Sequence, residues 1–120
     1  MVSSTLRSQI IRACEPSTCC DEVWEAACQR FESPDQEVRK FRKRLLALGA
    51  GQWPNSSPIV ELFCGRGNGL RVLEGLGFTN LTGVDLSERL LEQFEGNATL
   101  YVADVRSLPF ADDSFDTVIV

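Results

Sequence analysis

The sequence has no histidine, so it lacks the commonest metal ligand and the commonest general base near neutral pH. Any base in this chain is therefore Asp, Glu, Lys, Tyr or Cys, or it lies outside the chain. The sequence also has no apolar run of about 18 residues, so we expect no transmembrane helix and no membrane partner. Arg7 and Arg12 precede the first acid, Glu15, but no apolar secretory core accompanies them, and we expect a cytoplasmic protein.

Positive charge is in deficit. Twelve Lys and Arg residues stand against seventeen Asp and Glu, and the formal net charge of -5 gives no overall positive field to attract a nucleic acid. The five cysteines are odd in number and lack the paired spacing of a disulfide framework or a zinc site, so we expect reduced thiols and no metal. The 120 residues, 43% hydrophobic and 24% charged, match one soluble globular domain.

The composition changes near Gly51, and we place a boundary there. Residues 1–52 are interpreted as a helical N-terminal segment, and residues 53–120 as a unit of short apolar runs punctuated by glycine. A first helix is predicted over 21–32. The apolar face of this helix carries Trp24, Ala27 and Phe31. We expect the aromatic residues Trp24, Phe31 and Phe41 to pack into the core, while closure over a substrate stays an alternative.

A second helix is predicted to begin at Pro34, after a Ser33 cap, and to end at Gly49. Its apolar stripe, expected to pack inward, consists of Val38, Phe41, Leu45 and Leu48. Its opposite face is basic and holds Arg39, Lys40, Arg42, Lys43 and Arg44. This pattern favours a solvated helix face, while contact with an anionic substrate or RNA stays an alternative.

From Pro54 onward, apolar stretches of strand length alternate with helices. The strands are predicted over 58–63, 81–85, 99–103 and 115–120. The helices between them are predicted over 69–77 and after Ser87, which caps the second one. This alternation indicates βαβ units, and therefore an α/β fold with a doubly wound, Rossmann-like parallel sheet that is truncated after its fourth strand.

The segment around the end of the first strand carries the chemistry. Residues 59–69 place Glu61 near the strand end, followed by a glycine-rich turn and a helix, and such a turn lets the backbone approach a ligand closely. Asp85 and Asp104 end the second and third strands. Each acid alone is compatible with a helix cap or a surface position. Because the carboxyl ends of parallel strands line the ligand crevice, the three acids together favour a nucleotide-type site.

The residues of this turn separate the candidate ligands. A dinucleotide fingerprint has a third glycine where this sequence has Leu70, and the charge of Glu61 opposes a pyrophosphate. S-adenosylmethionine carries a sulfonium and an ammonium and no phosphate, so a carboxylate at Glu61 suits it. The sequence therefore favours S-adenosylmethionine over NAD.

Four motifs in this order resemble those of class I S-adenosylmethionine-dependent methyltransferases, of the small-molecule type common in bacteria. They are ELFCGRGNG, GVDLS, ADVRSLPFADDSFD and the TVIV strand, and they lie within residues 58–120. The resemblance implies methyl transfer from S-adenosylmethionine to an unidentified acceptor, expected to be a small molecule, with no catalytic base assignable in this chain. It also implies that the chain is an N-terminal fragment, inactive alone, whose fourth strand is a bare edge.

The resemblance implies cofactor-binding roles for seven residues. Those at the methionine end are Glu61, Gly65 and Gly67, and those at the adenosine end are Asp85, Leu86, Asp104 and Val105. Asp85 would hold the ribose hydroxyls, and Leu86 would lie beside the adenine. Asp104 would accept a hydrogen bond from the adenine amino group, and the Val105 amide would meet a ring nitrogen. Phe63 departs from the family pattern, since many members have glycine there.

Two other functions stay open. An aminopropyl transferase has a similar fold and uses a decarboxylated cofactor, and it would show acidic polyamine-binding residues after the fourth strand. A non-catalytic module would bind the cofactor or a partner without turnover. Cys64 lies beside the glycine turn with no His or nearby Lys, and we expect an inert buried thiol rather than a nucleophile.

Overall fold

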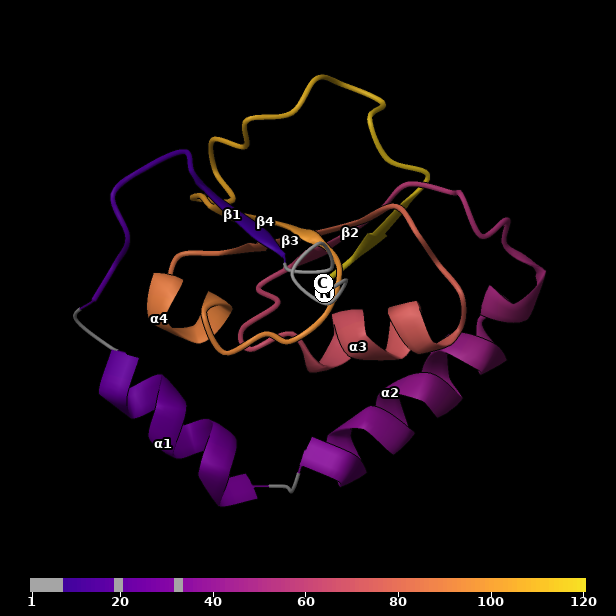
Figure 1. The fold of residues 1–120 in the computed structure, drawn as a ribbon, viewed down its shortest axis with the longest axis horizontal. Helices are drawn as coiled ribbons and strands as arrows, with labels where there is room; N and C mark the ends of the chain where they lie inside the picture. The colour runs from indigo at the N-terminus through magenta and orange to yellow at the C-terminus, as the bar shows by residue number, and fades with distance from the viewer. Residues whose placement is uncertain (1–7, 19–20, 32–33) are drawn as a thin grey trace, which may run out of the picture.

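The computed structural model describes residues 8–18, 21–31 and 34–120. Within them, five strands form one parallel sheet in the order β1-β4-β3-β2-β5 (Figure 1). The strands are β1 (Gln9–Arg12), β2 (Ile59–Leu62), β3 (Leu81–Asp85), β4 (Thr99–Val102) and β5 (Thr117–Ile119). The helices are α1 (Asp21–Phe31), α2 (Pro34–Ala47), the short 3-10 helix η2 (Ala50–Gln52), α3 (Asn68–Gly75) and α4 (Glu88–Leu91). The predicted α/β class with a parallel sheet is confirmed.

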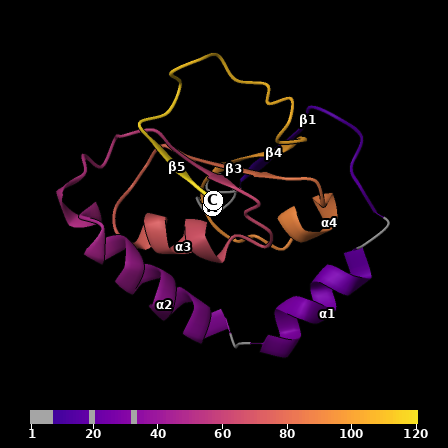
Figure 2. The ribbon, with the colours of Figure 1, turned by 180° about the vertical axis from the view of Figure 1, so that it is seen from behind.

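The described helices cover one face of the sheet. α3 and α4 lie next to the sheet, and α2 and α1 lie outside them (Figures 1 and 2). α2 contacts α3, and α1 contacts α4. The side chains that are buried most completely between these layers are Ile59, Leu70, Leu73, Leu91, Leu100 and Val102. Their burial holds the carboxyl ends of the central strands in place, where the site residues lie.

The four strands predicted from the sequence are present as β2, β3, β4 and β5, and they lie in the order β4-β3-β2-β5, so that the chain returns to the other side of β2 after β4. β5 is shorter than the predicted range of 115–120. Ser87 caps α4 as predicted, since its Oγ accepts a hydrogen bond from Leu90 N at 3.2 Å. α4 itself spans only Glu88–Leu91.

β1 is a strand that the sequence analysis did not predict. It runs parallel to β4, with Gln9 opposite Thr99. Beyond its end, the amides of Ala13 and Cys14 both donate to the carbonyl oxygen of Val102, at 2.9 and 3.2 Å. Residues 1–52, which the sequence led us to interpret as a helical segment, thus also contain a strand. A strand this short is stabilised by a partner that lies far away in the sequence, so no local pattern indicates it.

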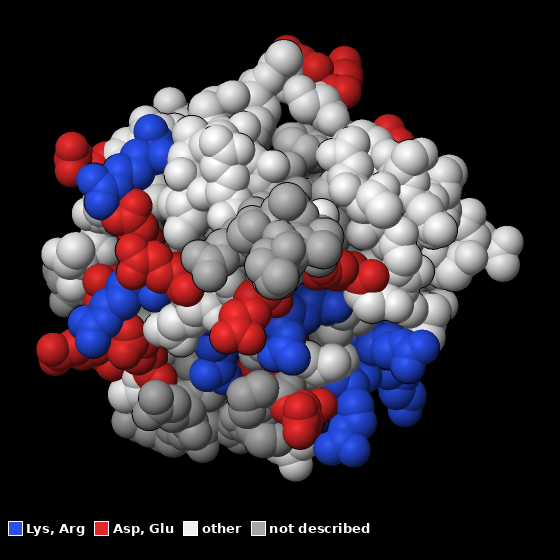
Figure 3. Space-filling model, viewed as in Figure 1, with Lys and Arg blue, Asp and Glu red and all other residues white. Residues whose placement is uncertain are grey.

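The apolar stripe predicted on α2 is confirmed at three positions and wrong at one. Leu45 is buried, and Val38 and Phe41 pack against the core. Leu48 is 73% exposed, because α2 has already ended and the chain turns at Gly49 with a φ of 91°. The predicted basic face is exposed at Arg39, Lys40, Arg42, Lys43 and Arg44. Figure 3 shows these cations gathered over α2, at the lower right.

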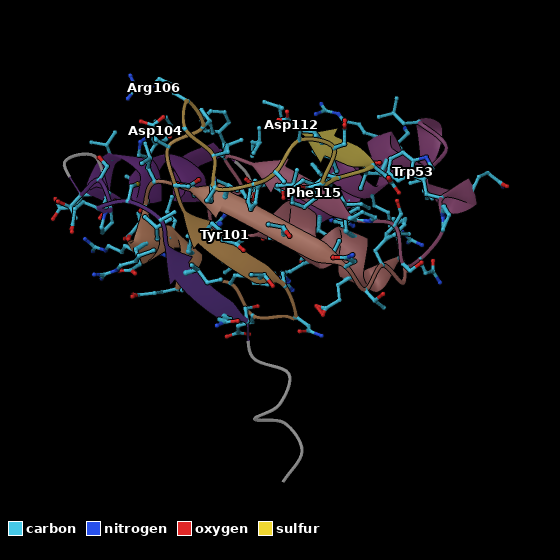
Figure 4. All side chains as sticks on the ribbon, turned by 90° about the horizontal axis from the view of Figure 1, so that it is seen from above. Trp53, Tyr101, Asp104, Arg106, Asp112 and Phe115 are labelled. Carbon is cyan, nitrogen blue, oxygen red and sulfur yellow. The ribbon has the colours of Figure 1, made fainter. Side chains whose placement is uncertain are left out.

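The opposite face of the sheet carries no helix among the described residues. The segment 103–116 crosses this face instead (Figure 4). Phe110 packs edge-on against Tyr101 of β4 and against Phe115, with ring centroids 4.9 and 5.0 Å apart. Below them lies a small buried cluster of Val60, Val84 and Ala103. At the sheet edge, β5 leaves Val118 56% exposed.

Some predictions fall on positions that the structure does not describe. Cys19, Cys20 and Ser33 lie outside the described residues, as do the side chains of Ala27, Cys28 and Phe31. In the part of the chain that is described, no helix is both long and apolar enough to cross a membrane. The same part holds no cluster of three Cys, Asp or Glu side chains arranged to bind a metal ion.

Candidate functional site

The glycine turn, residues 63–67, connects β2 to α3. Three of its residues have a positive φ: Phe63 at 58°, Gly65 at 56° and Gly67 at 86°. Glycine adopts this left-handed region without a steric penalty, whereas other residues lose about 1 kcal/mol or more. Phe63 is therefore strained at the very position where the resemblance leads us to expect glycine.

Close contacts explain two glycines near this turn. A Cβ at Gly67 would lie 2.3 Å from Phe94 Cδ1, and a Cβ at Gly69 would lie 2.5 Å from Glu61 Oε2. The sequence led us to expect that Gly67 contacts the ligand. In the structure, a side chain at this position would instead collide with the buried Phe94 ring. Gly69, which the sequence analysis did not single out, allows α3 to approach the Glu61 carboxylate.

Glu61 is a buried carboxyl group whose hydrogen-bonding capacity is not fully satisfied by the described residues. Its side chain lies on the helix-covered face of β2, and its Oε1 has no hydrogen-bond partner among the described residues. Burial and the nearby negative charge of Asp85 raise the pKa of Glu61 from 4.5 to about 8. A cationic or hydrogen-bond-donating ligand group beside Glu61 would satisfy this oxygen and favour its ionised form.

Asp85 joins the glycine turn to the start of α4. Its Oδ2 accepts a hydrogen bond from Gly65 N, and its Oδ1 accepts one from Ser87 N, both at 2.9 Å. A carboxylate has about four acceptor sites, so two remain for a ligand. The half-buried side chain thus has a structural role, in addition to the predicted contact with ribose hydroxyls.

A cavity of about 360 Å³ opens beside Asp85, and we call it the apolar cavity. It is lined by Trp24, Phe63, Gly65, Asp85, Leu86, Leu90, Ala103 and Val105. The structure therefore brings four of the seven predicted cofactor-binding residues together here. An apolar lining with one convergent carboxylate is typical of a small-molecule site.

A second cavity of about 390 Å³, the charged cavity, lies between α2 and the glycine turn. It is lined by Glu37, Lys40, Phe41, Arg44, Glu61, Phe63, Cys64, Gly65, Arg66, Asn68 and Gly69. Phe63 and Gly65 line both cavities, so the two meet at the turn. Glu37 of α2 accepts hydrogen bonds from Asn68 and Arg66, which ties α2 to the turn.

Asp104 stands apart from both cavity linings. Its carboxylate pairs with the guanidinium of Arg106, with 2.6 Å between Oδ2 and the nearest nitrogen, and its Oδ1 also accepts from Arg106 N at 2.9 Å. Figure 4 shows the two side chains together at the rim of the sheet. The hydrogen bonds from Arg106 lower the pKa of Asp104 to about 2. Its predicted adenine contact stays a prediction, and it requires Asp104 to share its oxygens with Arg106.

Two further predictions concern Cys64 and Trp24. Cys64 is buried. Burial is the main cause that raises the pKa of its thiol, and the charge of Glu61 adds to it, so the reactive thiolate is disfavoured. Trp24 was predicted to pack in the core, but it is 58% exposed and lines the apolar cavity. Helical periodicity groups Trp24 with other apolar positions of α1, and only the tertiary structure separates a core face from a cavity wall.

A parallel sheet with acids and a glycine turn at its carboxyl ends places the chain among Rossmann-like nucleotide-binding folds. The family model described as "Methyltransferase domain" matches residues 59–120. The chain belongs to this methyltransferase domain family, and the resemblance found in the sequence is confirmed. No protein of curated function matches the sequence significantly.

Two solved methyltransferase structures share the fold, and a third is similar in sequence over part of the chain. The plantazolicin methyltransferase BpumL in complex with SAH has a TM-score of 0.61 at 18% identity, over 85% of this chain and 41% of that one. SAM-bound CalS10, an amino pentose methyltransferase from Micromonospora echinaspora, has a TM-score of 0.55 at 24% identity, over 80% and 40%. An S-adenosylmethionine-dependent methyltransferase from Mesorhizobium loti has a TM-score of 0.49 at 33% identity, over 60% and 36%. The chain thus spans about two fifths of these proteins.

Proposed function

We propose that this chain binds S-adenosylmethionine and is part of an enzyme that transfers the cofactor's methyl group to a small-molecule acceptor. The observation that carries the proposal is the buried Glu61 carboxylate, whose Oε1 has no partner among the described residues. An unpaired buried acid is costly unless a ligand compensates it, and the cofactor's ammonium group is such a partner.

The donor set of the two cavities fits the two ends of this cofactor. The charged cavity, with Glu61 and Gly65, would receive the methionine end. The apolar cavity would receive the adenosine end, with Asp85 accepting from the ribose hydroxyls and Leu86 and Val105 beside the base. Because Phe63 and Gly65 line both cavities, one extended ligand can occupy both.

The cofactor, when bound, supplies a methyl group on a sulfonium. The residues of this chain orient that group and exclude water from it, which is the main protein contribution to an in-line displacement. No residue of this chain is assigned as a base. Two fold neighbours are named for plantazolicin and an amino pentose, which supports a small-molecule acceptor.

The proposal predicts that cofactor binding displaces a proton from Glu61. In the free chain at neutral pH this carboxyl is mostly protonated, because its pKa is about 8. A bound ammonium favours the ionised form, so binding should release up to about one proton. Calorimetry in buffers of different ionisation enthalpy measures this release. Glu61→Gln should release none and bind about tenfold more weakly, whereas the exposed Glu95→Gln should behave as the wild type.

The same group gives a readout without ligand. The folded chain binds the Glu61 proton more tightly than the unfolded chain, since the pKa rises from 4.5 to about 8 on folding. Its contribution to the free energy of unfolding is therefore full below pH 4.5 and is lost as the pH rises through about 8. Denaturation curves of wild type and Glu61→Gln should diverge over this range. Equal curves, with equal affinities and no proton release, would remove the basis of the proposal.

A further inference from the structure

The exposed apolar side chains of the described residues are not scattered evenly. Trp24 and Phe63 are the two aromatic residues among the large hydrophobic side chains that are exposed in this part of the chain, at 58% and 61%. Both line the apolar cavity, although one comes from α1 and the other from the glycine turn. Leu86, which is 37% exposed, lines the same cavity. Exposed apolar side chains that gather in one concave site indicate a ligand-binding site, whereas single exposed apolar residues scattered over a surface do not.

Polar contacts hold Trp24 at this cavity. On its N-terminal side, Asp21 accepts a buried hydrogen bond from Ser87 Oγ at 2.6 Å. On its C-terminal side, Glu25 forms an ion pair with Arg89 at 2.6 Å. Both partners belong to α4 or its cap, so these contacts fix α1 beside α4, where Figures 1 and 2 show the two helices adjacent. The position of Trp24 is thus set by its neighbours on α1 and not by burial of its own ring.

Phe63 is placed at the cavity by a strained backbone. Its φ of 58° lies in the left-handed region, and its ring, largely exposed, gains little from packing in return. Residues in this region concentrate at binding sites, where a ligand contact offsets the cost. Glycine would adopt the same turn without strain, so the phenyl ring itself needs an explanation.

We propose that Trp24 and Phe63 form an aromatic clamp that binds the planar base of an adenosine-containing ligand. This inference rests on the proposed function and extends it to a residue of α1 that precedes the matched family region. Aromatic rings bind a nucleobase through its flat faces, and the apolar side chains of Leu86 and Leu90 complete the wall. Asp85 in the same cavity accepts from ribose hydroxyls, which favours a nucleoside over a simple arene.

Fluorescence tests the clamp directly, because the chain has only two tryptophans. Trp53 is half-buried and packs against Phe78, with ring centroids 6.1 Å apart, so Trp53→Phe leaves Trp24 as the reporter. Adenosine and S-adenosylhomocysteine should each change the Trp24 emission of this variant on titration. Free methionine, which has no base, should leave it unchanged.

Affinity measurements provide the second readout. Trp24→Ala and Phe63→Leu should each weaken adenosine and S-adenosylhomocysteine binding by roughly tenfold, the loss expected for one base-stacking ring. Trp24→Phe, which keeps a ring, should lose less than Trp24→Ala. Val23→Ala, also exposed on α1 but absent from the cavity lining, is the matched control and should bind as the wild type.

The outcomes separate the clamp from the proposed function. If the wild type binds S-adenosylhomocysteine while the ring variants bind equally well and Trp24 emission stays constant, the clamp is wrong and the proposed function stands. If the wild type binds neither S-adenosylhomocysteine nor adenosine, both are wrong. Loss of binding in Trp24→Ala with unchanged circular dichroism, together with the emission change, supports the clamp.

Discussion

The carboxylate of Asp85 has both a structural and a binding role. It accepts hydrogen bonds from the amides of Gly65 and Ser87, and it also lines the apolar cavity. Its substitution should therefore affect folding and binding together. Sequence patterns place an acid at the end of a strand, but they do not show that the same acid supports the glycine turn.

Asp85→Ala leaves two amides without an acceptor, and it should lower the free energy of unfolding by about 1–3 kcal/mol. It should also weaken S-adenosylmethionine binding tenfold or more, because the ribose hydroxyls lose their acceptor. Chemical denaturation and calorimetry measure the two effects. Asp112→Ala, on the exposed loop before β5, is the control and should change neither. Asp113 is a poorer control, because its φ of 58° makes alanine strained there. Equal cofactor affinity in Asp85→Ala and Asp112→Ala would show that the ribose assignment is wrong.

Among single residues, the sequence correctly predicted that Glu61 and Asp85 are acids near strand ends and close to the glycine turn, because residue type and spacing contain that information. It did not predict the pairing of Asp104 with Arg106, which depends on side-chain geometry in an exposed loop. It also assigned Trp24 to the core, since periodicity identifies an apolar face without identifying what covers it.

The connection from β2 to α3 depends on glycine at specific points along the chain. Gly67→Ala combines a φ of 86° with a Cβ only 2.3 Å from the Phe94 ring, so it should lower the free energy of unfolding by about 2–4 kcal/mol. Gly75→Ala, at the end of α3, meets nothing within 4 Å and should be neutral or stabilise the chain by up to about 1 kcal/mol. Thermal or chemical denaturation of the pair checks this. Equal stability of the two variants would contradict the packing account of Gly67.

Elements were predictable where the pattern is local. Alternation of apolar strands and amphipathic helices indicated β2, α3, β3, β4 and β5. The capping side chain of Ser87 indicated the start of α4, although its single turn was not foreseen. β1 was missed because its stability comes from pairing with β4 and not from its own four residues.

In the whole molecule, the sheet has unequal cover on its two faces and an edge at β5. No strand pairs with the outer side of β5 in the described part of the chain, and Val118 is 56% exposed there. An unpaired apolar edge promotes association between chains. The family resemblance, and not the local sequence pattern, implied this edge, and the aromatic cover of Tyr101, Phe110 and Phe115 was not predictable.

The isolated chain should therefore associate as its concentration rises, and Val118→Lys should reduce this association because a charge on an edge strand opposes pairing. Sedimentation velocity over a concentration series measures the effect. Leu48→Lys is the control, since Leu48 is 73% exposed but lies away from the sheet, and it should leave association unchanged. A wild-type chain that stays monomeric throughout the series would contradict this account of the edge.

The proposed site accepts S-adenosylmethionine and rejects a dinucleotide, and titration calorimetry of the wild-type chain with S-adenosylmethionine and with NAD distinguishes the two ligands. Leu70 occupies the position of the third fingerprint glycine and is fully buried. The buried Glu61 carboxyl, whose pKa is raised to about 8, would be ionised and compensated by a bound ammonium, whereas a pyrophosphate would oppose its ionisation. We expect measurable binding of S-adenosylmethionine and no binding of NAD at the same concentrations. NAD binding as tight as, or tighter than, S-adenosylmethionine binding would contradict it.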